Sequence, residues 1–404
     1  MTHKFSLVLL LFVLAAPRAF AQSTNPDPDA QAKVRIGPFS MSPTLALTNM
    51  GIDNNVFNEP DQLAPKRDFT VTVTPATDMW LRMGHTWITG NVKSDLVYYK
   101  KYASERSAND SYKLGWLVPL NRLTFNVNGT YLNTRERPGF EIDARSQRIE
   151  KSADGSVEIR VLSKTFFGVR ADRHWVNYDK AAVFLDVNLH DELSRVVTTE
   201  AITVRHRLTP LTDVTLDISR DEERFEFSHL RDSDSTAVSA GFKFDPFALL
   251  KGSATFGYKD FKPLSPDYPR YKGSTAAVNL SYVALGTTKL SVQGTRDVQY
   301  SYNINQPYYV LTGVTGTVDQ QLYGPLDLQL RAGVQQLAYR DRTDVPIAVP
   351  ERVDYVHSYG GGIGYRFGTD FRIGVNVDNA RRTSKVDTRT YSGLRIGTSV
   401  TYGF

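Results

Sequence analysis

The sequence predicts a transmembrane antiparallel β-barrel, and three observations carry this prediction. The chain begins with residues typical of an export signal, apolar and polar residues then alternate with period 2 almost to the last residue, and short turns are expected to alternate with longer polar loops. Period 2 is typical of strands whose two faces contact different surroundings. We therefore expect an all-β, up-and-down barrel of about 18 strands, with short periplasmic turns and longer extracellular loops.

The export signal lies at the N-terminus. Lys4 precedes an apolar run from Phe5 to Ala16, and the small-residue pattern Ala19-Phe20-Ala21 follows. A basic start, a short apolar run and small residues at the cleavage point are typical of a secretory signal peptide. The predicted organisation is a signal peptide over 1–21, a flexible periplasmic tail over 22–38 and an outer-membrane barrel over 39–404.

Composition excludes several classes of protein. The 404 residues include no cysteine, so disulfides and cysteine metal sites are excluded. No stretch approaches the roughly 20 apolar residues of a membrane helix. The formal charge of +5 falls to +3 without Lys4 and Arg18 of the signal peptide, and no dense basic stripe is left to bind nucleic acid.

The clearest strand is the last one. Its apolar face carries Leu394, Ile396, Thr398, Val400, Tyr402 and Phe404, and small or polar residues occupy the positions between them. The spacing by two of Val400, Tyr402 and the terminal Phe404 resembles the C-terminal assembly signal that the barrel-insertion machinery reads. The same alternation is seen in segments 69–83, 123–131, 328–335 and 371–378.

The connections also follow a pattern. Eight short turns are expected at 84–85, 120–121, 163–164, 209–212, 250–251, 286–287, 324–325 and 368–370. Nine longer polar loops are expected at about 51–67, 103–110, 135–146, 179–192, 228–234, 262–273, 303–308, 341–353 and 383–388. These connections join 18 strands, and an even number places both termini on the periplasmic side.

Two positions break the alternation. Arg296 is in phase with Leu290 and Val292 on the apolar face, where a guanidinium costs about 2 to 4 kcal/mol at the middle of the membrane. The phase also slips after Arg220. A β-bulge resets the register by one residue, so we expect a bulge at each position, or for Arg296 a place near the membrane interface.

The polar face of the strands predicts a hydrated lumen lined by both signs of charge. The residues predicted to line the solute path are Arg122, Arg170, Arg205, Arg207, Lys243, Arg331, Arg372 and Arg395. A net positive wall would favour anions, whereas cations paired with the wall's acids would only keep the interior wet. The sequence leaves both open. Trp87, Tyr99 and Tyr391 are expected to offer aromatic faces to passing sugar rings.

A search for catalytic motifs gives no candidate. The sequence has no metal-type histidine pair, no Gly-x-Ser-x-Gly elbow and no phosphate-binding glycine loop. His174 and Asp172 share the predicted lumen face and are the pair whose mutation would test an enzymatic alternative. The expectation is a protein that is not an enzyme and uses no metal or cofactor.

Three segments carry a family resemblance. They are Gly51-Ile52-Asp53-Asn54-Asn55-Val56-Phe57, Arg137-Pro138-Gly139-Phe140-Glu141-Ile142-Asp143 and Leu208-Thr209-Pro210-Leu211-Thr212. Their order and spacing resemble a family of outer-membrane β-barrel porins along essentially the whole mature chain. Members of that family are commonly encoded with exopolysaccharide biosynthesis and export genes. The resemblance implies a passive outer-membrane conduit for a secreted polysaccharide, and it brings no known site residues with it.

The expected function is thus export of an anionic or neutral exopolysaccharide through a hydrated, mixed-charge lumen. A general or small-solute porin is the alternative, and an enzyme or a surface adhesin comes third. The expected partners are outer-membrane lipid, the barrel-assembly machinery, the polysaccharide and its periplasmic export components, and not nucleic acid.

Overall fold

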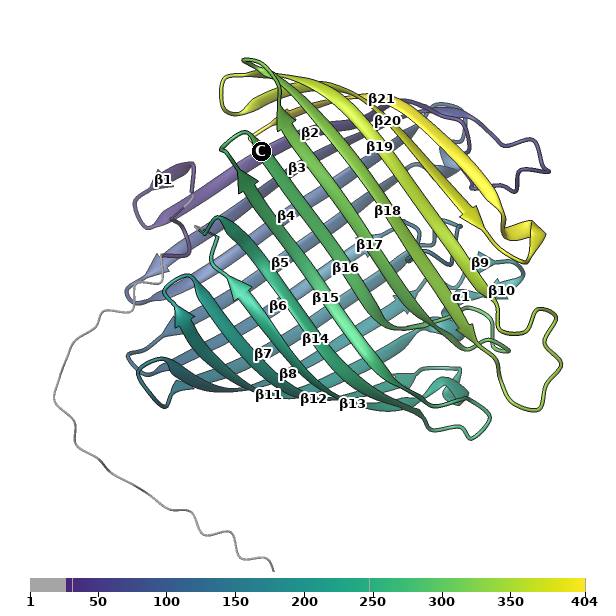
Figure 1. The fold of residues 1–404 in the computed structure, drawn as a ribbon, viewed down its shortest axis with the longest axis horizontal. Coiled ribbons are helices and arrows are strands. Elements are labelled where there is room, and N and C mark those ends of the chain that lie inside the picture. The colour runs from purple at the N-terminus through teal and green to yellow at the C-terminus, as the bar shows by residue number, and fades with distance from the viewer. Residues whose placement is uncertain (1–26, 31, 247, 404) are drawn as a thin grey trace, which may run out of the picture.

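A computed structural model describes residues 27–404 except 31, 247 and 404, and it forms a closed barrel of tilted strands (Figure 1). The predicted signal peptide and Phe404 lie outside the described residues. Eighteen long antiparallel strands make the wall, as predicted. They are β2 (Phe39–Asp53), β3 (Asp68–Met83), β4 (Thr86–Tyr99), β5 (Ser107–Pro119), β6 (Leu123–Thr134), β7 (Arg148–Arg160), β8 (Thr165–Tyr178), β11 (Arg195–Thr209), β12 (Thr212–Phe225), β13 (Ser233–Phe244), β14 (Leu250–Pro263), β15 (Tyr271–Ala284), β16 (Thr288–Tyr300), β17 (Tyr308–Gln321), β18 (Leu326–Arg340), β19 (Val353–Phe367), β20 (Phe371–Thr383) and β21 (Tyr391–Tyr402).

Pairing between the first and last long strands closes the barrel. Each long strand pairs with its neighbour in the chain, and β2 also pairs with β21, from Leu45 opposite Tyr402 to Asp53 opposite Arg395. The register of β2 shifts between Leu47 and Met50, where Asn49 adopts a left-handed backbone with φ 53°. Closure leaves no free sheet edge along the paired part of the wall, which satisfies the backbone in lipid.

Short turns and long loops occupy opposite ends of the barrel, as the sequence predicts. One turn lies elsewhere than expected: it falls between Phe244 and Leu250, whereas Leu250-Lys251 begin β14. The long loops hold all the small elements after β2, which are β9 (Val183–Phe184), β10 (Val187–Asn188), α1 (Leu189–Leu193), η1 (Ala103–Glu105), η2 (His229–Arg231) and η3 (Asp387–Arg389). Among the described residues, no helix is long and apolar enough to cross a membrane.

The outer face of the wall is apolar, as the alternation predicts. Along β20 and β21 the exposed side chains include Ile373, Val375, Val377 and Ile396. Aromatic residues also point outward from this face, since Trp116 is 54% exposed and Tyr258 56% exposed. A face of this kind is solvated by lipid, and the opposite residues of each strand line the lumen.

Neither predicted bulge occurs. The ladders on both sides of β12 are regular around Arg220, and those of β16 are regular up to Arg296. Phe225 keeps the lumen-facing phase of β12 and is buried there. The phase slips because the lumen is not polar along its whole length. At the end with the long loops, inward positions carry apolar residues.

The described end of the predicted tail contacts the rim of the barrel. Val34–Ile36 form a short strand, β1, that pairs with the start of β2. Lys33 Nζ lies 2.8 Å from Asp370 Oδ1 and donates a hydrogen bond of 2.6 Å to the Gly403 carbonyl. In Figure 1, β1 and the C-terminal end lie at the end opposite β9, β10 and α1. A strand of three residues is too short for alternation to indicate it.

Candidate functional site: a lumen crossed by inward-folded loops

The loop between β6 and β7, residues 135–147, crosses the lumen, and we call it the plug loop. Glu141 at its centre accepts a hydrogen bond of 2.6 Å from Ser301 Oγ and one of 3.2 Å from the Tyr302 amide. These two residues belong to the loop between β16 and β17. Six strands separate the two hairpins around one side of the ring and eight around the other. Contact between them therefore spans the barrel.

A buried ion network holds the plug loop against the opposite wall. Arg382 on β20 is fully buried, and its Nη2 lies 2.6 Å from Asp354 Oδ2 on β19. Its Nη1 lies 3.3 Å from Asp143 Oδ2 in the plug loop and donates to the carbonyls of Phe140 and Glu141. Because buried charges are costly without partners, each ion in this network depends on the others.

Further arginines fix the backbone of the plug loop. Arg389 Nη2, from the loop between β20 and β21, lies 2.9 Å from Asp143 Oδ2 and also donates to the Glu141 carbonyl. Arg137 joins the Asp143 carbonyl to that of Val56 in the loop between β2 and β3. Burial raises the pKa of Glu141, and the Ser301 hydrogen bond and Arg389 oppose that shift. Three other loops and strand β20 thus position one short segment.

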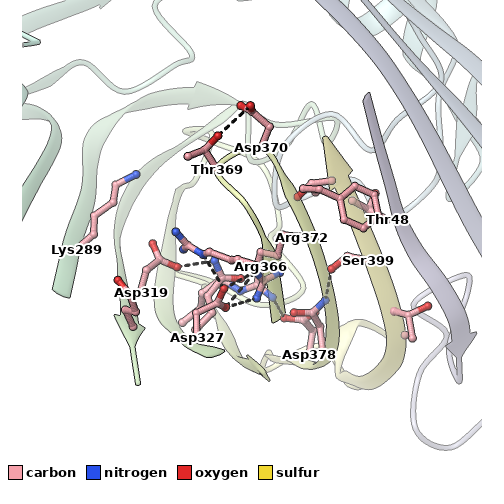
Figure 2. A pocket seen from close by; sticks show the side chains of 18 of the residues that line it. Thr48, Lys289, Asp319, Asp327, Arg366, Thr369, Asp370, Arg372, Asp378 and Ser399 are labelled. Atoms are coloured by element: carbon pink, nitrogen blue, oxygen red, sulfur yellow. Dashed lines mark hydrogen bonds and ion pairs between the residues drawn. The ribbon is translucent and has the colours of Figure 1, made fainter. Parts of the chain in front are cut away.

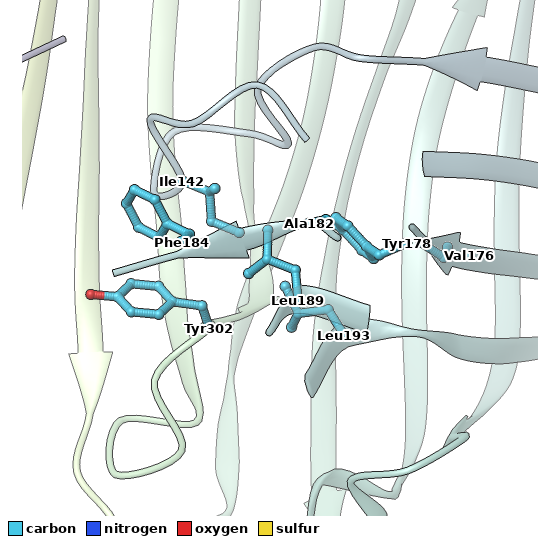
Figure 3. Packing of buried hydrophobic residues seen from close by; sticks show 8 residues of the cluster. All are labelled: Ile142, Val176, Tyr178, Ala182, Phe184, Leu189, Leu193 and Tyr302. Atoms are coloured by element: carbon cyan, nitrogen blue, oxygen red, sulfur yellow. The ribbon is translucent and has the colours of Figure 1, made fainter. Parts of the chain in front are cut away.

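An apolar core supports the same arrangement inside the barrel (Figure 3). It joins the plug loop, the end of β8, the β8–β11 loop and the β16–β17 loop through Ile142, Val176, Tyr178, Ala182, Phe184, Leu189, Leu193 and Tyr302. The rings of Phe184 and Tyr302 meet edge to face, with centroids 4.9 Å apart. Burying a large apolar side chain contributes about 1.5 to 3 kcal/mol. The loops are therefore packed as a small folded unit.

A polar cavity of about 600 Å³ lies at the short-turn end of the lumen (Figure 2). Most of its charges are paired, and three of these pairs join β18 to β19 and to β20. Asp327 on β18 lies 2.9 Å from Arg366 Nε and 2.6 Å from Arg372 Nη2, and Arg331 Nη2 lies 2.6 Å from Asp378 Oδ1. Asn376 donates to Ser399 on the same wall. The cavity therefore presents hydrogen-bonding groups with little net charge.

Glycines on β19 make room for this polar wall. The lumen-facing positions there include Gly360, Gly362 and Gly364. A Cβ at Gly364 would collide with the Arg372 guanidinium, and one at Gly360 would collide with the Asp378 carboxylate. Absence of side chains at these positions lets the neighbouring arginine and aspartate lie flat across the strand. Gly360, Gly362 and Gly364 are thus adaptations to the lumen lining, whereas Gly361 between them faces outward.

The structure places most of the predicted path residues on lumen-facing strand positions, and five of the eight are ion-paired. Those five are Arg205 with Glu158 and Asp213, Arg207 with Asp213, Arg331 with Asp378, Arg372 with Asp327, and Arg395 with Asp53. Arg170 and Lys243 lie on the lumen faces of β8 and β13 and are exposed. Arg122 lies in the turn between β5 and β6 at the rim, off the strand wall.

The aromatic residues expected to face passing sugars are covered. Trp87, Tyr99 and Tyr391 are only 4%, 3% and 5% exposed. Tyr99 accepts a hydrogen bond from Arg145 of the plug loop. The expectation of open stacking faces is therefore wrong for this arrangement of the loops. His174, half of the enzymatic alternative, has its Nε2 3.3 Å from Glu150 Oε2, not from Asp172.

Sequence reasoning missed the residues that hold the plug loop across the lumen, above all Glu141, Ser301, Asp354 and Arg382. One signal was present. Leu337 and Tyr339 on β18 occupy the polar phase near the end of the strand, and both are buried in the lumen with Tyr309, Leu311 and Val356. Apolar residues on both faces of a strand end indicate that something packs inside the barrel at that level.

The paired wall predicts weak charge selectivity. We expect a channel whose plug loop is replaced by a Gly/Ser linker to show a reversal potential near zero in a salt gradient across a planar bilayer. Removing positive charge with Arg331→Gln and Arg372→Gln should raise the cation-to-anion permeability ratio severalfold, because Asp378 and Asp327 would lose guanidinium partners. Strong anion preference in the parent channel would contradict this prediction.

A closed barrel with an apolar outer belt, a polar lumen and loops folded into its mouth defines an outer-membrane channel protein. The sequence agrees: residues 27–404 match the family described as "Putative beta-barrel porin 2". The chain belongs to this family of porins, and its place is the bacterial outer membrane.

Solved structures with similar folds are distant in sequence. A BenF-like porin from Pseudomonas fluorescens Pf-5 is 11% identical, with 91% of this chain and 98% of that chain covered and a TM-score of 0.49. OccK2 (OpdF) from Pseudomonas aeruginosa, solved in complex with glucuronate, is 10% identical, with 90% and 97% covered and a TM-score of 0.47. The outer membrane protein opdK from Pseudomonas aeruginosa is 10% identical, with 90% and 98% covered and a TM-score of 0.44. No curated protein matches the sequence.

Proposed function

We propose that this porin is an outer-membrane conduit for a secreted polysaccharide and that its mouth is closed when no chain is being exported. The observation that carries the proposal is the plug loop, held across the lumen by Arg382 and by Ser301 of the far hairpin. An 18-stranded barrel without such a plug is wide enough for an aqueous channel. A conduit of that width that stayed open would let small solutes leak whenever it was idle.

The lining suits a hydrophilic chain without strong charge. Paired guanidinium and carboxylate groups, with Asn376 and Ser399 between them, offer donors and acceptors to hydroxyl groups. Because the wall charges largely compensate one another, each group on the wall would bind a polymer only weakly. Weak binding suits export, because a moving chain must be released from each group in turn. Periplasmic export components would deliver the chain at the short-turn end, where this cavity lies.

The alternative is a small-solute porin, and one observation favours it. The cavity of about 600 Å³ has the size of a small-molecule pocket, so it would hold one solute of a few sugar units. On this alternative the plug loop would narrow a permanent pore, and no polymer would pass.

Gene deletion separates the two. We expect deletion to lower polymer in the medium at least tenfold, with precursor retained in the periplasm or synthesis stopped, and the wild-type gene to restore secretion. A variant with Arg366→Gln and Arg372→Gln should restore it less well than Arg224→Gln, a matched change in an ion pair on the outer face. Unchanged secretion after deletion would refute the conduit, and liposome swelling with sugars of increasing size would then measure the solute cutoff.

A further inference from the structure

The hairpin of β16 and β17 leaves the barrel wall at its loop end. The ladder between β15 and β16 stops at Ala276 opposite Arg296, although β15 begins at Tyr271 and β16 continues to Tyr300. Within the described residues, no strand pairing joins 271–275 to 297–300. The two strands of the hairpin remain paired to each other as far as Tyr300 opposite Tyr308. An open seam therefore separates β15 from the end of the hairpin.

The end of the hairpin lies inside the barrel. The Tyr300 ring lies 4.7 Å from that of Phe225 on β12 and 5.9 Å from that of Phe261 on β14, between ring centroids. Its hydroxyl is 2.6 Å from Ser233 Oγ on β13. These partners face the lumen on strands two to four positions away around the ring. The outer surface of the hairpin thus packs against the inner surface of the wall.

The residues buried by this packing have the phase of lipid-facing residues. Val298 and Val310 are opposite each other in the ladder, in phase with exposed Leu290 and Val314, yet they are 9% and 1% exposed. They form a cluster with Phe261, Tyr271 and Tyr308. An apolar stripe of this kind is stable either against the lumen aromatics or, with the hairpin in the wall, against lipid or the membrane interface.

The chain permits the second arrangement. Continuing the existing register would place Ser274 opposite Val298 and Gly273 opposite Gln299. No proline lies in 271–276 or 296–300, so every backbone amide there can join a ladder. Closing the seam would satisfy backbone groups that now lack strand partners. The sequence and the register are therefore compatible with a second, outward position of the hairpin, and two such positions are what a switching element requires.

We propose that the end of the β16–β17 hairpin is the gate of this channel, closed when folded inward and open when it pairs with β15. Glu141 contacts Ser301 and Tyr302 at the hairpin tip, so outward movement of the hairpin would release the plug loop. Arg231 holds the closed position by donating to the carbonyls of Ser301, Tyr302 and Pro307. The gate is independent of which solute or polymer passes.

A contact between the β14–β15 loop and the β18–β19 loop, which we call the clasp, would hold the hairpin in its inward position. Asp267 Oδ2 in the β14–β15 loop lies 2.7 Å from Arg342 Nη2 in the β18–β19 loop, and the Asp267 carbonyl accepts from the Thr343 amide. These two loops flank the β16–β17 loop, and the backbone amide of Arg342 also donates to the carbonyl of Asn305 in that loop. Outward movement of the hairpin requires this clasp to open.

The absence of cysteine makes a disulfide test clean. Gly273→Cys with Gln299→Cys would trap the paired, open position. Ala277→Cys with Thr295→Cys is the matched control, because those residues are already opposite each other in the ladder. Each pair is oxidised in outer membranes, scored on a non-reducing gel and measured by single-channel conductance in planar bilayers before and after reduction. The Gly273→Cys single variant controls for contact of the new side chain with the Tyr271 hydroxyl.

We expect both disulfides to form, with the 277–295 pair leaving conductance unchanged. The 273–299 disulfide should raise single-channel conductance at least severalfold, and reduction should reverse the rise. The proposal is overturned if 273–299 stays reduced while 277–295 oxidises, or if the 273–299 disulfide forms and conductance stays at the wild-type value. Both results are independent of polymer secretion, so failure of the gate and failure of the export proposal are distinguishable.

Discussion

Replacing Arg382 with alanine is expected to open the channel. The substitution leaves Asp354 and Asp143 without this guanidinium and frees the carbonyls of Phe140 and Glu141. Breaking a buried ion pair from one side costs about 3 to 5 kcal/mol. The substitution therefore destabilises the docked plug loop relative to the undocked one. An undocked loop returns Asp143 to water, while the hydrogen-bonded wall of the barrel stays intact. We expect single-channel conductance to rise severalfold and residues 135–147 to become sensitive to protease.

Arg224→Ala is the matched control. Arg224 is paired with Asp234 at 2.7 Å but lies on the outer face, and its side chain is 41% exposed. Exposed pairs are worth about 0 to 1 kcal/mol, so conductance and protease sensitivity should stay at the wild-type level. A protease-resistant, low-conductance Arg382→Ala channel would show that the apolar core alone holds the plug loop.

Replacing 136–146 with a short Gly/Ser linker is expected to have the largest effect on conductance. The linker removes Glu141, Ile142 and Asp143 together, and with them the contacts to Ser301, the apolar core and both arginines. The wall should remain folded, because its ladders do not include the loop. We expect large, ohmic single-channel currents and passage of sugars too large for the wild type, measured by planar-bilayer recording and liposome swelling.

A replacement of 344–348 by the same linker tests for a general effect of loop exchange. This tip of the β18–β19 loop is largely exposed and lies outside the contacts of the plug loop. Its exchange should leave conductance unchanged. If exchange of 136–146 gave currents no larger than exchange of 344–348, the constriction would have to be formed by the other inward loops, among them the one that carries Tyr302.

The sequence supported prediction of the wall because the wall obeys a local rule. Each strand separates lipid from lumen, so every second residue reports its solvent, and Ile396 or Val375 can be assigned without knowledge of any neighbour. The number of strands follows from the alternation of turns and loops. Ion pairing of the residues predicted to line the solute path was harder to predict from the sequence. Arg372 is separated from its partner Asp327 by 45 residues, and only the register of β18, β19 and β20 brings them together.

The alternation of apolar and polar residues could not predict the inward-folded loops. Glu141 and Ser301 are 160 residues apart, and Glu141 reads as an ordinary charged residue in a polar loop. The bulges expected at Arg220 and Arg296 were wrong for the same reason. Phe225 departs from the polar–apolar order because of what packs inside the lumen, and β16 stays in register with β17 past Arg296, so neither break in the alternation reflects a change in strand register.

The sequence by itself determined the class of fold, the 18-strand count, the outward apolar belt and the charged lining, because each depends on a strand's own two faces. Only the tertiary structure decided that the lining is largely ion-paired, that the mouth is crossed by a plug loop and that the loop end of the β16–β17 hairpin lies inside the barrel. Those features depend on contacts between distant segments. Closing the barrel into a ring brings such segments within a few ångströms of one another.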